Sequence, residues 1–411
     1  MNIPVMSKTL YLSRTGMLEP LGQSQVLSYL RGLSREFEVT LISFERSEHL
    51  READQLARIE ELCASHGIRW VRKRYLQRPR VMASALNLLS LFFVTWREAR
   101  RSGARLIHAR SYVPAAAGWA VSRLSGIPYI FDMRSLWPEE LVTSKRMRRG
   151  SWLHKLIFAA EGRLLRDAAA IVSLTRAALP YLNAVHPGAL WGERVRVIPT
   201  CTDLERFRPL GPAAKEQNEF VVSCHGSLTN GWFDVSALAQ VFNRLAEARP
   251  EARFEVITRD RADLVLARLG GAQNYRDRLS IYPARASEIH EKLQRHSLSV
   301  FFYVPGATSE LGRSPTRMGE ALACGIPVLT TYGVGDVAKI LRDDRVGVVL
   351  DALDHRALTA GLAELDALMK DPELSGRCRR VAESIYSLES GTKRYAGLYH
   401  DLLDGAPAAS R

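Results

Sequence analysis

The segment SPTRMGEALACGIPVLTTYGVGD, residues 314–336, combines a turn, a helix that ends at Gly325 and a buried strand directly after it. Ser314, Pro315 and Thr316 are residue types that suit the start of a helix. The first backbone N–H groups of a helix have no partner inside it, and they lie at the positive end of the helix dipole. The segment therefore predicts an α/β unit with an anion site at the edge of its sheet.

Two side chains strengthen this interpretation. The Thr316 hydroxyl and the Arg317 guanidinium would add hydrogen-bond donors for a phosphate. Glu320, about one helical turn further on, could accept hydrogen bonds from ribose hydroxyls. An ordinary capped helix that stops at Gly325 would show the same local pattern.

Strand-like and helix-like patterns alternate over most of the chain, which favours parallel sheets covered by helices on both faces. The fold class is therefore α/β. The strands expected in the first half are residues 9–12, 39–44, 105–109, 129–132 and 169–174, and a further strand is expected from Val195. Those expected in the second half are residues 220–224, 254–258, 279–282, 298–303, 328–331 and 346–350.

Two domains are expected, because 411 residues exceed what one hydrophobic core usually serves. We expect an N-terminal Rossmann-like domain over residues 1–208 and a C-terminal one over residues 209–385. Residues 386–405 should form a helix that packs back toward the N-terminal domain, and residues 406–411 should be a disordered tail.

The composition excludes several classes of protein. Lys and Arg number 57 against 44 Asp and Glu, a net charge of +13 that favours phosphate-bearing partners. The five cysteines show no C-x-x-C spacing, so we expect core thiols rather than disulfides or a zinc site. No secretory signal is recognised, and the apolar stretch 81–96 is too short for the about 20 residues of a spanning helix, so we expect a cytoplasmic protein.

The segment 314–336 resembles the donor-binding signature of the retaining glycosyltransferases of family 4, which have the GT-B fold. The similarity extends to YLSRTGMLEPLGQSQVLSYLRGLSREFEVTLISF at the start of the chain, to IVSLTRAALPYL and VRVIPTCTDLERFRP before the domain boundary, and to VVSCHGSLTNGWFDV after it. The resemblance implies two Rossmann-like domains that face each other across a cleft, the C-terminal one binding a nucleoside-diphosphate sugar.

By this resemblance Glu320 binds the ribose of the donor and is the first candidate for a catalytic residue. Ser314, Pro315, Thr316 and Arg317 form the turn that holds the diphosphate. Many members of the family have a second Glu eight positions before the first. That position is Gly312 here and the nearest acid is Glu310, which leaves the recognition of the sugar open.

The loop HGSLTNGWFD adds Gly226 and Ser227 to the expected donor site, since a glycine lets the backbone approach a phosphate. Relatives often carry a basic residue here, and this chain has none between His225 and Arg244. Arg259 and, behind it, Arg285 are the expected substitutes, because a departing diphosphate needs a positive charge. Both could equally be plain surface arginines.

The N-terminal half should supply the acceptor site from the ends of its strands. Arg110 stands where many relatives have a histidine, and it cannot act as a base because it stays protonated. Asp132 and Arg110 are candidate catalytic residues, and His108 comes one strand residue too early. The candidates for acceptor binding are Arg134 and Glu139, beside Glu140, together with Gly22, Gln23 and Ser24 of the first loop.

Two basic and apolar stretches, residues 71–101 and 144–166, favour contact with an anionic membrane surface. The residues expected to face the membrane are Lys145, Arg146, Arg148, Arg149 and Trp152. An amphipathic helix that covers the sheet is the alternative. No recognition motif for nucleic acid accompanies the charge, so nucleic acid is not an expected partner.

The function implied is transfer of a sugar, with retention at the anomeric carbon and without a metal or other cofactor, from a UDP- or GDP-sugar to a lipid-linked or glycan acceptor in cell-surface polysaccharide synthesis. Such an enzyme would be peripheral on the inner face of the cell membrane. Two alternatives stay open: a nucleotide-sugar 2-epimerase of the same fold, and a catalytically silent nucleotide-sugar-binding partner of a polysaccharide assembly complex.

Overall fold

The computed structural model describes residues 6–210, 219–229, 231–304 and 306–404, except for the side chains of residues 80 and 81. The chain forms two compact units. The N-terminal unit consists of Met1–Pro138, Met147–Ile198 and Leu388–Arg411, and the C-terminal unit of Glu139–Arg146 and Pro199–Ser387. The division thus falls after Ile198 rather than after residue 208, and the expected tail at 406–411 lies outside the described residues.

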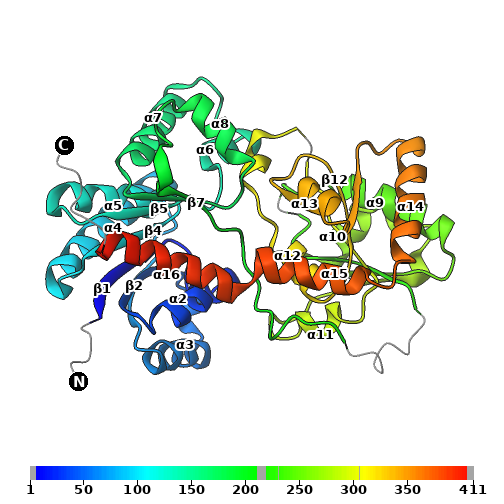
Figure 1. Cartoon of the computed structure of the whole chain (residues 1–411), viewed down its shortest axis with the longest axis horizontal. Helices are drawn as coiled ribbons and strands as arrows, with labels where there is room; N and C mark the ends of the chain where they lie inside the picture. The colour runs from blue at the N-terminus through cyan, green and yellow to red at the C-terminus, as the bar shows by residue number, and fades with distance from the viewer. Residues whose placement is uncertain (1–5, 211–218, 230, 305, 405–411) are drawn as a thin grey trace. The chain divides into compact units, whose positions relative to one another are not determined.

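The N-terminal unit has a seven-stranded parallel sheet in the order β3-β2-β1-β4-β5-β6-β7 (Figure 1). Its strands are β1 (Ser7–Ser13), β2 (Phe37–Glu45), β3 (Arg69–Arg74), β4 (Leu106–Arg110), β5 (Tyr129–Asp132), β6 (Ala170–Ser173) and β7 (Val195–Val197). Its helices are α1 (Pro20–Gly22), α2 (Ser28–Leu33), α3 (Ala53–Ser65), α4 (Arg80–Ser102), α5 (Tyr112–Ser125), α7 (Trp152–Asp167), α8 (Ala178–Val185) and α16 (Leu388–Asp404), while α6 (Trp137–Thr143) crosses from this unit into the other.

The C-terminal unit has a six-stranded parallel sheet in the order β10-β9-β8-β11-β12-β13. Its strands are β8 (Val221–His225), β9 (Arg253–Ile257), β10 (Leu279–Tyr282), β11 (Leu298–Val300), β12 (Val328–Thr331) and β13 (Gly347–Leu350). Its helices are α9 (Val235–Ala248), α10 (Ala262–Arg268), α11 (Ile289–Leu293), α12 (Thr316–Ala323), α13 (Val337–Asp343), α14 (His355–Met369) and α15 (Leu374–Val381).

These sheets confirm the doubly wound α/β class. The central strands are buried on both faces, as in β5 and β6, where every residue is buried, so near-continuous apolar runs form them. One strand was missed. Strand β3 has the sequence RWVRKR and lies at the edge of its sheet, where charged side chains reach solvent.

Helix α16 returns to the N-terminal unit and packs against α2 and β4, as Figure 1 shows. Its inward face carries Tyr395, Leu398 and Tyr399, all buried. The five cysteines are buried, and none of them forms a disulfide within the described structure. Among the described residues, no helix is long and apolar enough to cross a membrane.

The packing of β13 against β12 gives a test of the C-terminal core. A Cβ at Gly347 would lie 2.1 Å from the Val328 carbonyl oxygen, and backbone cannot move aside cheaply. We expect Gly347→Ala to lower the free energy of unfolding by about 1–3 kcal/mol or more. The matched control is Gly397→Ala on the exposed face of α16, where nothing lies within 4 Å and alanine should stabilise the helix by about 0.5–1 kcal/mol. Thermal unfolding of both variants checks this, and equal midpoints would contradict it.

Candidate functional site

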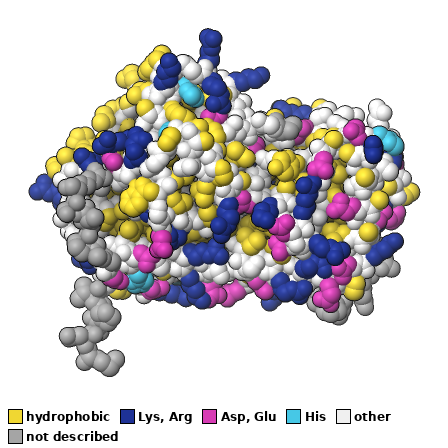
Figure 2. Space-filling view, turned by 45° about the horizontal axis from the view of Figure 1, so that its top comes forward, with side chains coloured by type: hydrophobic (Ala, Val, Ile, Leu, Met, Phe, Trp, Pro, Cys, Tyr) yellow, Lys and Arg dark blue, Asp and Glu magenta, His cyan; other side chains and the backbone are white. Residues whose placement is uncertain are grey.

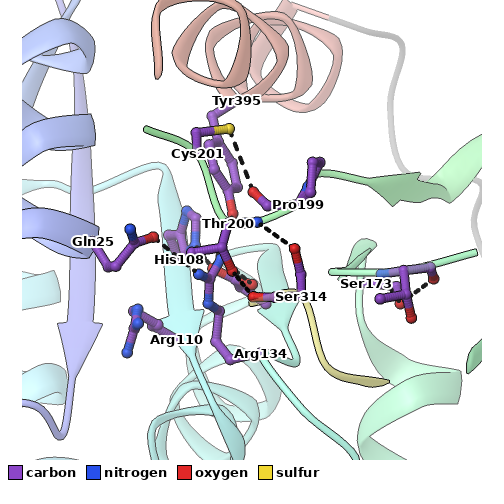
Figure 3. A network of polar contacts seen from close by, with 12 residues as sticks. Gln25, His108, Arg110, Arg134, Ser173, Pro199, Thr200, Cys201, Ser314 and Tyr395 are labelled. Carbon is purple, nitrogen blue, oxygen red and sulfur yellow. Dashed lines mark hydrogen bonds and ion pairs between the residues drawn. The ribbon is translucent and has the colours of Figure 1, made fainter. Parts of the chain in front are cut away.

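The turn before α12 is anchored to the segment that opens the C-terminal unit. The Thr200 backbone N–H donates to Ser314 Oγ at 3.2 Å, and the Thr200 hydroxyl donates to the Ser314 carbonyl at 2.9 Å (Figure 3). Pro315 is the N-cap residue of α12, and no side chain of the described residues makes a capping hydrogen bond to the helix. The turn expected from the sequence is therefore in place, with the first N–H groups of α12 uncapped by any side chain.

Glu320 is held by a histidine from the end of β8. His225 Nε2 lies 3.0 Å from Glu320 Oε2, and His225 is buried while the Glu320 side chain is 19% exposed. Burial lowers the pKa of His225 below its usual range, although the hydrogen bond to Glu320 opposes this. A neutral His225 donates its Nε2 proton to Glu320. This donation fixes one carboxylate oxygen and leaves the other for a ligand.

Arg317 is the cation of this site. Its guanidinium lies over the rings of Phe233, at 5.4 Å, and Tyr303, at 5.8 Å. Its Nη1 is buried without a hydrogen bond to any described residue. Gly226 makes room for it: Gly226 has φ +103°, and a Cβ there would lie 2.6 Å from Arg317 Nη2. Only glycine suits both the backbone angle and the space.

Arg259 and Arg285, the expected substitutes for a missing basic residue, do not join this cluster in the described structure. Both are exposed, and Arg285 lies 3.9 Å from Glu288, its ion-pair partner. The loop after β8 carries no basic residue of its own, and Arg317 reaches it from α12. A role of Arg259 and Arg285 in donor binding stays a prediction.

The Ser227 side chain forms hydrogen bonds that hold its own loop. Its hydroxyl donates to Asp260 Oδ1 and Oδ2, each at 3.2 Å, and the same carboxylate accepts the N–H groups of Leu228 at 2.6 Å and Thr229 at 3.0 Å. Burial alone would raise the pKa of Asp260, but these hydrogen bonds hold it below its usual range. Asp260 was not predicted, although an acid just after strand β9 was a usable signal.

Glu310 does not replace the missing second glutamate of the family pattern. Its carboxylate accepts from Arg313 Nε at 2.6 Å and Nη2 at 3.0 Å, and it is buried. Arg313 also lies over the rings of Trp232 and Tyr303. Glu310 is thus part of the support beneath the turn.

Polar side chains meet at the carboxyl edge of the N-terminal sheet. Ser13, Arg110 and Asp132 end β1, β4 and β5 and pair in register across the sheet. From β1 the chain adds β2 and β3 on one side of the sheet and then β4 and the later strands on the other side. Doubly wound sheets bind ligands at such a switch point, which here lies between β1 and β4. The strand ends that the sequence indicated are therefore brought together.

Asp132 is the centre of this cluster and is 1% exposed. Its Oδ2 accepts from the Tyr395 hydroxyl at 3.1 Å and from His108 Nε2 at 3.3 Å, and His108 Nδ1 is 2.8 Å from the Tyr399 hydroxyl. Burial opposes ionisation, but Arg134 and His108 hold the pKa of Asp132 below its usual range. Burial also lowers the pKa of His108, so this histidine is neutral.

Arg134 adopts a left-handed backbone conformation, with φ 62°. Its Nη1 lies 3.6 Å from Asp132 Oδ1 and donates to the Tyr395 hydroxyl at 3.4 Å, and its Nη2 donates to Gln25 Oε1 at 3.5 Å (Figure 3). Such strain in a non-glycine residue persists only where surrounding contacts hold it. The sequence did not predict a role for Gln25, Tyr395 or Tyr399. Of these three, only Gln25 lies in a segment that resembles the family.

The remaining acceptor candidates have local roles. Gly22 is buried, and a Cβ there would lie 1.9 Å from the Gly16 carbonyl oxygen, so Gly22 allows close packing. Ser24 donates its hydroxyl to the Pro20 carbonyl at 3.0 Å. Gln23 begins a π-helical turn, Gln23–Leu27, and is partly buried. Glu139 is buried in α6, within the segment that belongs to the C-terminal unit.

The residues expected to face a membrane fall in two units. Lys145 and Arg146 belong to the C-terminal unit, whereas Arg148, Arg149 and Trp152 belong to the N-terminal one. All five are exposed, Trp152 by 77%. Figure 2 shows hydrophobic areas with Lys and Arg between them on the unit that Figure 1 draws on the left.

Further apolar side chains are exposed on the N-terminal unit. Met82, Leu86, Leu89 and Phe93 are exposed along one face of α4, and Leu153 and Leu156 are exposed on α7. Helix α5 contacts both α4 and α7. In the part of the chain that the structure describes, no three His, Cys, Asp or Glu side chains cluster as a metal site would require.

Comparisons with known proteins match most of the chain. The model of Glycosyltransferase Family 4 matches residues 22–206, and that of Glycosyl transferases group 1 matches residues 219–367. D-inositol 3-phosphate glycosyltransferase from Arthrobacter sp. (strain FB24) is 26% identical over 322 residues, which cover 73% of this chain and 71% of that protein.

Solved structures share the fold at low identity. Sucrose-phosphate synthase from Thermosynechococcus elongatus has a TM-score of 0.69 at 16% identity, covering 97% of this chain and 100% of that one. Anabaena Alr3699/HepE in complex with UDP has a TM-score of 0.66 at 14% identity, covering 96% and 100%.

The lowered pKa of His225 predicts how stability depends on pH. The unfolded chain takes up a proton at this histidine as the pH falls through 6.5, its ordinary value, while the folded chain takes it up only at lower pH. Stability is therefore complete above about pH 6.5 and is lost below it, by up to about 1.4 kcal/mol per pH unit for one proton. We expect His225→Gln, which keeps a donor for Glu320, to reduce this loss between pH 6.5 and 5.

Urea unfolding at several pH values measures the slope. The control is His355→Gln, since His355 is exposed at the start of α14 and should leave the slope as it is. A slope in His225→Gln equal to that of the native chain would show that His225 is not the group that takes up the proton.

Proposed function

Because this chain belongs to the glycosyltransferases of the family 4 and group 1 type, with their GT-B fold, we propose that it transfers a sugar from a nucleoside-diphosphate sugar to a lipid-linked or glycan acceptor in cell-surface polysaccharide synthesis, with retention at the anomeric carbon. The observation that carries this proposal is the arrangement of Arg317, Glu320 and the uncapped N-terminus of α12 at one end of the C-terminal sheet.

The donor's diphosphate fits this arrangement by its charge. The start of α12 offers backbone N–H groups and Thr316, and Arg317 adds a fixed guanidinium whose Nη1 has no hydrogen bond to any described residue. Glu320 accepts hydrogen bonds from the ribose with the oxygen that His225 does not occupy. The solved complex of HepE with UDP supports a uridine nucleotide as the first to try, with GDP as the second.

The chemistry follows from the placement of charge. The acceptor hydroxyl oxygen forms a bond to the anomeric carbon while the bond from that carbon to the β-phosphate oxygen breaks. Arg317 and the α12 N–H groups stabilise the negative charge that grows on the leaving diphosphate. The leaving phosphate oxygen takes the acceptor's proton, so no protein base is required. Because Arg317 supplies a positive charge, the reaction as proposed needs no metal.

Asp132 has a positioning role in this proposal. Its Oδ2 accepts two hydrogen bonds and its Oδ1 faces Arg134, and the whole carboxylate is buried. It therefore orients Arg134 and is not placed to take a proton from an acceptor. Arg110, which stays protonated, binds and does not act as a base.

The apolar faces of α4 and α7 would place the enzyme at an anionic lipid surface on the inner face of the membrane. Met82, Leu86, Leu89 and Phe93 recur at helical spacing along α4, and Trp152 and Leu156 are exposed beside basic residues on α7. Such a combination of apolar bulk and positive charge is typical of helices that lie in a membrane interface. A lipid-linked acceptor would be reached from there.

The first test measures donor binding and turnover with UDP-, GDP-, ADP- and CMP-sugars, with and without a bacterial lipid extract as acceptor source. We expect Glu320→Ala to weaken donor binding by about 10- to 100-fold, because a hydrogen bond to a charged group contributes about 1.5–3 kcal/mol. The control is Glu364→Ala, since Glu364 is exposed on α14. Binding without turnover would favour the silent partner, conversion without acceptor a 2-epimerase, and no binding at all would refute the proposal.

The membrane proposal is tested by sedimentation with vesicles of phosphatidylglycerol and phosphatidylcholine. We expect the double variant Trp152→Ser and Leu156→Ser to bind about tenfold more weakly or worse, because each buried large apolar side chain contributes about 1.5–3 kcal/mol. Leu264→Ser, which changes an exposed leucine of the C-terminal unit, is the control. Equal binding by all three proteins would remove α7 from the proposal.

A further inference from the structure

The edge of the N-terminal sheet holds more positive charge than its own carboxylates balance. Arg110 is 6% exposed and the Arg134 side chain 9%. Asp132 is the carboxylate that faces them, and its nearest guanidinium is that of Arg134. His108 is neutral because burial lowers its pKa. Two guanidinium groups thus share one carboxylate.

Another buried carboxylate in this unit is engaged elsewhere. Glu45 accepts the backbone N–H of Met17 at 2.8 Å and of Leu18 at 3.2 Å, together with the Ser43 hydroxyl at 2.6 Å. It therefore holds the loop after β1 and makes no ion pair with Arg110 or Arg134 among the described residues.

Arg110 itself has few partners. Its Nη1 donates to the Thr15 hydroxyl at 3.3 Å, and its Nε is buried without a hydrogen bond to any described residue. Its pKa is lowered by burial and by the neighbouring charge of Arg134. A buried guanidinium that shares its carboxylate with a second guanidinium is only partly compensated, so the folded chain retains Arg110 here at the expense of stability.

The backbone also contributes to the positive electrostatic potential beside Arg110 and Arg134. Arg110 ends β4, and α5 begins directly after it with Ser111 as N-cap, which makes no side-chain cap hydrogen bond and has φ 76°. The 14 residues of α5 point the positive end of their dipole at this edge of the sheet. Thr15, on the loop after β1, places the Arg110 guanidinium at the switch point between β1 and β4.

We propose that Arg110 and Arg134, with the start of α5, form a phosphate-binding site in the N-terminal unit, which takes a phosphate group carried by the acceptor. This rests on the proposed function for the identity of the ligand but not for the site itself. Contacts with Asp132, Tyr395 and Gln25 hold the Arg134 guanidinium, so its position is fixed before phosphate binds. Arg110 supplies the second guanidinium, and two such forks suit the oxygens of a phosphate.

The test uses the full chain and inorganic phosphate as the probe. Thermal unfolding is followed during a phosphate titration in Hepes buffer, with sodium acetate at equal ionic strength as the control for carboxylates and salt. We expect phosphate to raise the unfolding midpoint of the native chain. Arg110→Met should unfold at a higher midpoint than the native chain without phosphate, because it removes an unbalanced charge, and should bind phosphate at least tenfold more weakly.

A second variant separates this site from the donor site. Arg317→Gln should keep the response to phosphate, because Arg317 lies in the C-terminal unit. Arg110→Gln is the alternative should Arg110→Met not fold. Because the proposed donor site can also take phosphate, Arg110→Met is compared with the native residue in the Arg317→Gln background. A response that the double variant keeps, or that Arg317→Gln loses, or that acetate reproduces, would overturn the phosphate site. Intact phosphate binding in a chain that turns over no donor would refute the proposed function and leave this site standing.

Discussion

The ionised carboxylate of Asp132, buried at the end of β5, is the constraint on which the N-terminal unit depends. A carboxylate with 1% exposure must be compensated by hydrogen bonds and opposite charge, or it would take up a proton. Tyr395, His108 and Arg134 provide this compensation from α16, β4 and the segment after β5. The left-handed backbone of Arg134 and the seating of α16 both follow from that requirement.

In the C-terminal unit, one glycine makes room for the guanidinium of Arg317. Arg317 reaches from α12 into the space that Gly226 leaves at the end of β8, and aromatic rings of Phe233 and Tyr303 lie beneath it. His225, the residue before that glycine, holds Glu320. A single strand end thus positions both the cation and the carboxylate, so the two cannot move independently.

Much of the fold was predictable from the sequence, because apolar runs in parallel sheets mark strands clearly. Strand β3 was missed because an edge strand needs few apolar residues, and RWVRKR instead resembles a basic surface segment. The turn and Glu320 were recognisable because they are local to α12. The partners of Glu320 and Asp132 come from far along the chain, and no local pattern announces that His225 faces Glu320 or that Tyr395 and Tyr399 face the N-terminal sheet.

The position of α16 has a consequence for how the protein is synthesised. The helix that gives Asp132 and His108 their tyrosine partners, Leu388–Asp404, follows the whole C-terminal unit in the chain. Domains fold as they leave the ribosome, with the N-terminal parts first. Here the sheet of the N-terminal unit waits for a helix that is translated after the whole C-terminal unit. Until then its buried carboxylate has His108 and Arg134 beside it but lacks the Tyr395 hydroxyl, so the unit whose synthesis begins first is completed after the other.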